Sequence, residues 1–408
     1  MSCSADKSTS FAWKDAFLLL VSIFVCIFLI ELLYSAFLSY ASKRVHVYDS
    51  PYARFDVDTG YLLLPGPKRS VSFHGGKLLW DTIVRPNNLG YNSSNDYEFK
   101  KPTPETTRFI ILGDSFTAGD NMDVPWVDKF NEIIKPSGGQ AYAFSQQAIG
   151  LDNWHGIFFK QIVPQFEFDA VIIACYHNDL SRFFTIFHTE DNTTYYTRTN
   201  DPPHTLDDFF AKTFPKMIPL FKNSTPENVN HMLGPPIAVD KFSWKWAGFE
   251  FRLCRTAFAA VFPDNNARKT LFEHFYQDPP LRSLDEIIQS DPEFRGLTKL
   301  WNILEWCKAN NKPVILCSIP DIERLAPYIK SNGRFIGENQ RNLSSIAHHY
   351  GLFYFDGYSI FLGNSMNDIR KTYWPHEELH WGQEGAHLFA KRLSESIEQN
   401  RTKIFISN

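Results

Sequence analysis

A Gly-Asp-Ser block directly follows a short apolar run in the first third of the chain. The run Phe109–Leu112 ends at Gly113, and Ser115 comes two residues later. A serine that follows a buried strand and opens a helix lies where free backbone N–H groups and the helix dipole favour a developing oxyanion. This placement predicts that Ser115 is a nucleophile. The alternative is an ordinary helix N-cap.

Two later strand ends offer hydrogen-bond donors to the same oxyanion. Gly150 follows the apolar stretch Ala141–Ser145, and Asn178 follows Ala170–Cys175, the clearest strand pattern in the chain. The N–H of Gly150 and the side-chain amide of Asn178 would complete an oxyanion hole with the N–H of Ser115. The alternative for Asn178, which precedes an aspartate, is a turn residue.

A histidine suited to act as a general base stands near the C-terminal end. His380 precedes the last helical pattern, and Glu377 and Glu378 come shortly before it. An imidazole that takes the proton of Ser115 needs a carboxylate to orient it. Both glutamates fit by spacing, so either one can be the acid of a Ser-His-acid triad.

The stretch from His376 to His380 is also a literal H-E-x-x-H, the pattern by which two histidines on one helix bind zinc. Pro375 and Gly382 leave little more than one helical turn between them. A third ligand at metzincin spacing would fall on Ala386, which cannot bind a metal. A zinc protease is therefore the least favoured interpretation, and we expect no metal or organic cofactor.

Taken in order, these features resemble the GDSL/SGNH hydrolase family. The resemblance rests on the Gly-Asp-Ser block, the glycine after the second strand, the asparagine after the third and the acid-x-x-His near the end. It covers roughly residues 106–180 and 312–395.

The resemblance implies roles for four residues. Ser115 would be the nucleophile, Gly150 and Asn178 would complete the oxyanion hole, and His380 would be the base. It also implies a flavodoxin-like α/β sandwich with the strand order 2-1-3-4-5.

Two positions depart from the family pattern. The family usually has aspartate before the histidine, whereas Glu377 and Glu378 stand here. A glutamate can orient an imidazole from a slightly longer arm. Tyr176 stands where the asparagine block usually begins with glycine, which questions the size of the pocket. An inactive SGNH-like binding protein is therefore one alternative.

Alternation of strand and helix patterns predicts a three-layer α/β sandwich with about five parallel strands and helices on both faces. We expect strands at Phe109–Leu112, Ala141–Ser145, Ala170–Cys175, Pro313–Ile319 and Leu352–Phe355. We expect helices at Val124–Ile134, Asn153–Pro164, Leu297–Ala309, Gln340–His349 and Gly385–Glu398.

The chain divides into three parts by composition. Residues 1–44 form a tail and an anchor, residues 45–105 a turn-rich extension with short strands, and residues 106–400 the hydrolase domain. Residues 180–285 have no steady period, which indicates an insertion of loops and short helices that forms one wall of the substrate groove.

Overall composition excludes one class of partner, and the N-terminus suggests another. The 408 residues carry a net charge of −4, and we expect no nucleic acid as partner because the sequence lacks a basic stripe. Residues 16–38 are apolar apart from a few positions, long enough to span a bilayer. We predict a single-pass membrane protein with its catalytic domain outside the cytoplasm, with a cleaved signal peptide as the alternative.

These features predict an SGNH-type esterase that works through an acyl-enzyme. Its substrate would be a small-molecule or glycan ester, such as an O-acetyl group on an envelope glycan. A sugar O-acyltransferase that uses the same triad is a further alternative, because an acyl-enzyme can pass its acyl group to a hydroxyl instead of water.

Overall fold

The computed structural model describes residues 15–30, 44–74, 77–224, 295–374 and 380–405. The chain divides into two compact units, one of residues 1–45, 73–77 and 230–277, and the other of the remaining residues. The first unit contains a helix over residues 15–30 with exposed apolar side chains.

The predicted membrane segment reaches beyond that helix. In the part of the chain that the structure describes, no helix has both the length and the apolar character needed to cross a membrane. Residues 31–38 of the predicted segment lie outside the described residues.

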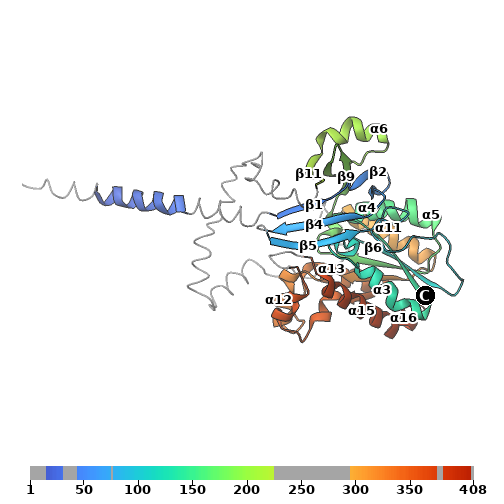
Figure 1. Cartoon of the computed structure of the whole chain (residues 1–408). Helices are drawn as coiled ribbons and strands as arrows, with labels where there is room; N and C mark the ends of the chain where they lie inside the picture. The colour runs from blue at the N-terminus through green and yellow to red at the C-terminus, as the bar shows by residue number, and fades with distance from the viewer. Residues whose placement is uncertain (1–14, 31–43, 75–76, 225–294, 375–379, 406–408) are drawn as a thin grey trace, which may run out of the picture. The chain divides into compact units, whose positions relative to one another are not determined.

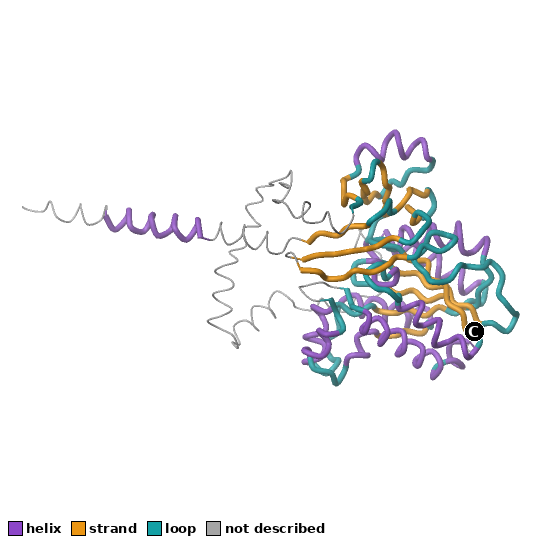
Figure 2. Tube along the Cα trace, viewed as in Figure 1, coloured by secondary structure: helices purple, strands orange, loops and turns teal. Residues whose placement is uncertain are grey.

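A parallel sheet of five strands forms the centre of the second unit (Figures 1 and 2). The order of the strands across this sheet is β13 (Phe353–Asp356), β12 (Val314–Ser318), β8 (Ala170–Cys175), β6 (Thr107–Gly113) and β7 (Gly139–Ser145). Every neighbouring pair is parallel. Numbered along the chain, the strands stand in the order 2-1-3-4-5. The predicted parallel sheet is thus confirmed.

The register of the sheet brings the carboxyl ends of its strands together. Gly113 at the end of β6 pairs with Ser145 of β7 and Ala174 of β8, and Ser318 of β12 pairs with Cys175. Residues that follow these strands therefore meet at one edge of the sheet, where ligands bind in such folds.

Helices cover both faces of the sheet because successive strand residues point to opposite faces. Phe109 and Ile111 pack in one buried cluster, and Ile110 and Leu112 in the other. The first cluster takes side chains from α3 (Trp126–Ile134), α12 (Ile322–Lys330), α15 (Gln383–Gln399) and α16 (Arg401–Phe405). The second takes them from α4 (Leu151–Gly156), η2 (Ile157–Ile162), α5 (Val163–Gln165), α11 (Arg295–Ala309) and α13 (Glu338–Tyr350).

Short helical elements complete the second unit. They are α2 (Ser115–Ala118), η1 (Lys135–Ser137), η3 (Asp179–Ser181), α6 (Leu206–Asp208), η4 (Phe209–Thr213), η5 (Phe214–Lys216), η9 (Gly357–Phe361) and α14 (Met366–Lys371).

The turn-rich extension before the central sheet contains five strands. One sheet has the order β1 (Arg44–Tyr48), β4 (Lys68–His74), β5 (Lys77–Val84), and β2 (Ala53–Asp56) pairs antiparallel with β3 (Gly60–Leu63).

The interpretation of residues 180–285 as loops and short helices missed a sheet in the described part, although α6, η4 and η5 are short helices there. There, β9 (Phe184–Glu190), β10 (Thr193–Thr199) and β11 (Ile218–Lys222) form an antiparallel sheet. The pattern was missed because the buried start of β9 includes the polar Thr185, so the sequence shows neither a continuous apolar run nor strict alternation. Residues 225–294 lie outside the described residues.

Candidate active site

The hydroxyl of Ser115 lies 2.8 Å from Nε2 of His380, although the two residues are far apart in the sequence. Both side chains are half-buried. A serine oxygen within hydrogen-bond distance of an imidazole is the arrangement that general-base activation requires.

In the turn after β6 the helix is capped by Asp114 and not by Ser115, whose hydroxyl lies 3.4 Å from Oδ2 of Asp114. Asp114 is the N-cap of α2, and its carboxylate accepts the N–H of Phe116 at 3.0 Å. The alternative of Ser115 as an N-cap is therefore wrong. The expected helix after Ser115 is a single turn that ends at Gly119 with a left-handed φ of 65°, so its dipole contributes little.

His380 is positioned by backbone pairing and by ring packing. Tyr373 and Trp381 form an antiparallel bridge, and the N–H of Trp374 donates to the carbonyl of His380 at 3.1 Å. The imidazole stacks on Phe116, with ring centroids 4.4 Å apart. Trp381 meets the same Phe116 ring edge-on at 5.3 Å. The residue next to Ser115 thus forms the platform on which the imidazole lies.

The candidate acids of the triad lie outside the described residues. Glu377 and Glu378, together with His376, belong to the segment 375–379. Residue 380 itself is a bend, and α15 begins only at Gln383. A zinc site of the H-E-x-x-H type needs both histidines on one helix, and the bend at His380 speaks against that arrangement.

Asn178 follows β8 at the same edge of the sheet as Ser115. It is the N-cap of η3, but its side chain makes no capping hydrogen bond. Its Oδ1 is buried and has no hydrogen-bond partner among the described residues. The interpretation of Asn178 as a residue that stabilises a turn through its side chain is therefore not supported.

Gly150 lies directly against the residues that follow Asn178. A Cβ atom at Gly150 would be 2.5 Å from the carbonyl oxygen of Asp179 and 2.7 Å from Cβ of Arg182. Only glycine permits this close approach. The two segments that carry the predicted donors after β7 and β8 are therefore in contact.

A buried ionic cluster, which the sequence analysis missed, connects the strand ends. Nη1 of Arg182 donates to Oδ2 of Asp114 at 3.1 Å and to the carbonyl of Ile149 at 2.9 Å. The same atom lies 3.0 Å from Oδ1 of Asp179. The spacing of Asp179 and Arg182, three residues apart, was the available signal for this pair.

Charge and burial act in opposite directions in this cluster. Both carboxylates are fully buried, and the Arg182 side chain is 9% exposed. Burial raises the pKa of Asp179, the Asp114 carboxylate raises it further, and Arg182 opposes both. The two acidic groups raise the pKa of Arg182 despite its burial. The guanidinium therefore stays charged.

Tyr176 packs inside the protein, away from solvent. Its residue is 4% exposed, and its ring stacks on Phe116 with centroids 4.6 Å apart. The ring belongs to the buried cluster on one face of the central sheet. Tyr176 thus supports Phe116 from within the protein.

The N-terminal extension contacts the turn that follows Ser115. The hydroxyls of Tyr48 and Tyr52 donate to Oδ2 of Asp120 at 3.2 and 2.8 Å. Nε2 of Gln147, in the loop before Gly150, donates to the same oxygen at 3.0 Å. Burial raises the pKa of Asp120 to about 6, and these hydrogen bonds oppose the rise.

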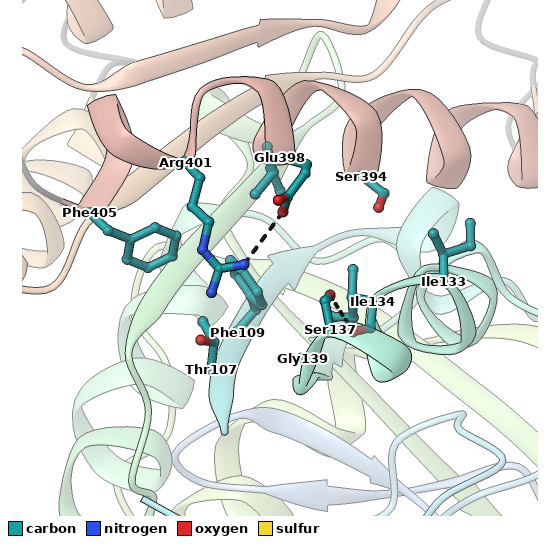
Figure 3. Close-up of a pocket in the computed structure, with 11 residues that line it drawn as sticks. Thr107, Phe109, Ile133, Ile134, Ser137, Gly139, Ser394, Glu398, Arg401 and Phe405 are labelled. Atoms are coloured by element: carbon teal, nitrogen blue, oxygen red, sulfur yellow. Dashed lines mark hydrogen bonds and ion pairs between the residues drawn. The ribbon is translucent and has the colours of Figure 1, made fainter. Parts of the chain in front are cut away.

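The cavity in Figure 3 lies at the opposite end of the strands, where β6 and β7 begin. It measures about 220 Å³ and is lined by Thr107 and Gly139, which begin β6 and β7, and by Arg401 and Phe405 of α16. None of the predicted site residues lines it. The cavity therefore lies apart from the serine–histidine contact.

The comparisons with known proteins found similar solved structures but no matching family model or curated protein. A GDSL-like lipase from Bacteroides thetaiotaomicron matches with 12% identity and a TM-score of 0.35, over 73% of this chain and 91% of its own.

Two further solved structures match at comparable levels. The lipase Lip_vut3 from a goat rumen metagenome has 13% identity and a TM-score of 0.32, over 71% of this chain and 97% of its own. A family two carbohydrate esterase from Clostridium thermocellum, in complex with cellohexaose, has 10% identity and a TM-score of 0.33, over 89% and 94%.

The fold and the site together define the class of molecule. It is an α/β protein with a five-stranded parallel sheet and a serine–histidine contact at the carboxyl edge of that sheet.

Proposed function

We propose that this chain is a serine ester hydrolase in which Ser115 is the nucleophile and His380 the base. The 2.8 Å contact between Ser115 and His380 carries the proposal. The loops that bear Gly150 and Asn178 meet at the same edge of the sheet, which supports an oxyanion hole there. Glu377 or Glu378 would orient the imidazole.

The proposed reaction has two steps. His380 takes the proton of Ser115 while its oxygen attacks the ester carbonyl, and the proton then goes to the leaving alcohol as the ester bond breaks. Water, deprotonated by His380, attacks the acyl-enzyme and releases the acid and the free serine. The negative oxygen of each tetrahedral intermediate would receive hydrogen bonds from the N–H groups of Ser115 and Gly150 and from the Asn178 amide.

The substrate we propose is a short acyl ester, such as an acetyl group on an envelope glycan. The apolar N-terminal segment motivates an envelope substrate. A panel of p-nitrophenyl esters of increasing chain length should show the highest kcat/KM for acetate. Preference for long acyl chains would contradict this choice, and an acetylated glycan product in the presence of a sugar acceptor would show a transferase.

Substitution of the nucleophile tests the reaction itself. Ser115→Ala should abolish p-nitrophenyl acetate cleavage and fluorophosphonate labelling, while circular dichroism and thermal melting stay unchanged. Ser137→Ala is a matched control, because Ser137 lines the cavity at the opposite end of the sheet, where its hydroxyl donates to the Ile134 carbonyl. If Ser115→Ala keeps full activity, or if mass mapping places the probe elsewhere, Ser115 is not the nucleophile.

A further inference from the structure

We infer that Arg182 is a positioning residue that aligns the three donors of the oxyanion hole. The inference rests on the proposed function. Each of the three groups that Nη1 of Arg182 contacts belongs to a residue directly next to a predicted donor. Asp114 precedes Ser115, Ile149 precedes Gly150 and Asp179 follows Asn178.

The contact with Ile149 sets the direction of one donor. The carbonyl of Ile149 and the N–H of Gly150 belong to the same planar trans peptide, so they point in opposite directions. Because Arg182 holds that carbonyl at 2.9 Å, it also fixes where the N–H of Gly150 points.

The contacts of Arg182 with Asp114 and Asp179 position the other two donors, which come from Ser115 and Asn178. Asp114 caps the turn that begins with Ser115, and Oδ2 of Asp179 accepts the N–H of Tyr176 at 2.7 Å, which closes the turn around Asn178. Arg182 lies between these carboxylates and balances their charge inside the protein. Loss of the guanidinium would remove the one group that contacts all three segments, so the two turns and the Ile149 carbonyl would no longer be held in a fixed arrangement.

The expected effect is on the chemical step. Arg182→Met should lower kcat for p-nitrophenyl acetate about 100-fold with little change in KM, because oxyanion stabilisation acts in the transition state. The rate of fluorophosphonate labelling of Ser115 should fall similarly. Arg182→Lys should recover part of the rate, since an ammonium supplies charge and donors on a shorter arm.

A double variant separates positioning from folding. Arg182→Met with Asp179→Asn removes one charge of each sign, so it leaves fewer unpaired charges than Arg182→Met alone. Asp179→Asn alone is the reference. Thermal melting establishes the folded fraction, and rates are compared per folded molecule. The double variant should keep the 100-fold loss in kcat.

A second buried arginine provides the matched control. Arg108 is fully buried at the beginning of β6, at the opposite edge of the sheet, where its guanidinium donates to backbone carbonyls that include those of Glu98, Lys100 and Glu167. Arg108→Met should lower the melting temperature and leave kcat per folded molecule unchanged.

The outcomes distinguish the inference from the proposed function. If wild-type Ser115 is not labelled, the proposed function fails and the inference with it. If wild-type Ser115 is labelled but the folded Arg182 variants react at the wild-type rate, as Arg108→Met should, Arg182 is only structural and the inference alone is overturned.

Discussion

At the scale of single residues, Phe116 connects the candidate nucleophile with its base. Its backbone N–H is held by Asp114, while its ring stacks on both the imidazole of His380 and the ring of Tyr176. The imidazole is therefore positioned by the packed interior as well as by any carboxylate. This arrangement explains how a large residue is accommodated where the resembled family usually has glycine.

Substitution of Tyr176 tests that explanation. Tyr176→Gly should lower the free energy of unfolding by about 3–5 kcal/mol, because it removes a buried aromatic ring and leaves a cavity. It should not widen the acyl-chain preference of the proposed ester cleavage. Tyr176→Phe should change the unfolding free energy by less than about 1 kcal/mol, because the buried hydroxyl has no hydrogen-bond partner among the described residues.

Urea denaturation and the p-nitrophenyl ester panel measure these effects. A Tyr176→Gly variant that keeps wild-type stability, or that gains activity toward long acyl chains, would show that the ring borders the substrate pocket.

At the scale of elements, the N-terminal extension supports the loops that carry the site. Tyr48 and Tyr52 come from the extension, and Asp120 and Gln147 from the turns after β6 and β7. The Asn92 amide also donates to the carbonyl of Ala118 at 2.9 Å. The extension therefore fixes the turn after Ser115 from outside the central sheet.

The Asp120 carboxyl gives this support a measurable pH dependence. Its pKa is about 6 in the folded protein and 3.8 in its ordinary state, so the folded protein binds a proton that the unfolded chain releases between these values. Stability contributed by this group therefore rises as pH falls through about 6 and is absent at higher pH. Relative to Asp120→Asn, the wild type should gain about 1–2 kcal/mol of unfolding free energy between about pH 7.5 and about pH 5.

Paired urea denaturation of the two proteins at both pH values measures that difference. Asp81→Asn is the control, because Arg69 lowers the pKa of Asp81 and the group stays ionised over this range. A pH-independent difference between wild type and Asp120→Asn would mean that Asp120 titrates outside this range.

At the scale of the whole molecule, we propose that the N-terminal apolar segment anchors the chain in a membrane with the domain that contains Ser115 outside the cytoplasm. The apolar sequence of residues 16–38 motivates the proposal. The full chain should stay with membranes through alkaline carbonate extraction, and a protease added to spheroplasts should digest the domain.

A variant that lacks residues 1–43 is the control for that fractionation and should be recovered in the soluble fraction. Release of the full chain by carbonate would contradict an integral anchor, and protection from the protease would contradict the proposed orientation.

Several features of this protein were determined by the sequence itself. Short continuous apolar runs such as Ala170–Cys175 are typical of strands covered on both faces, so they predicted the parallel sheet. Because the carboxyl ends of parallel strands share an edge, that sheet places Ser115, Gly150 and Asn178 at one edge of the fold. The antiparallel strands after Arg182 could not be predicted in this way, because they bury threonines such as Thr185 and Thr194 beside apolar residues and so show neither a continuous apolar run nor strict alternation.

Only the tertiary structure decided which distant groups meet. The contact between Ser115 and His380 depends on the ring of Phe116 and on the bridge between Tyr373 and Trp381, which no local pattern specifies. The position of Arg182 between carboxylates from two strand ends likewise follows from burial, because a charge inside the protein is stable only beside opposite charges. The local sequence determines where strands and helices form, whereas packing of the whole chain determines which distant side chains come into contact.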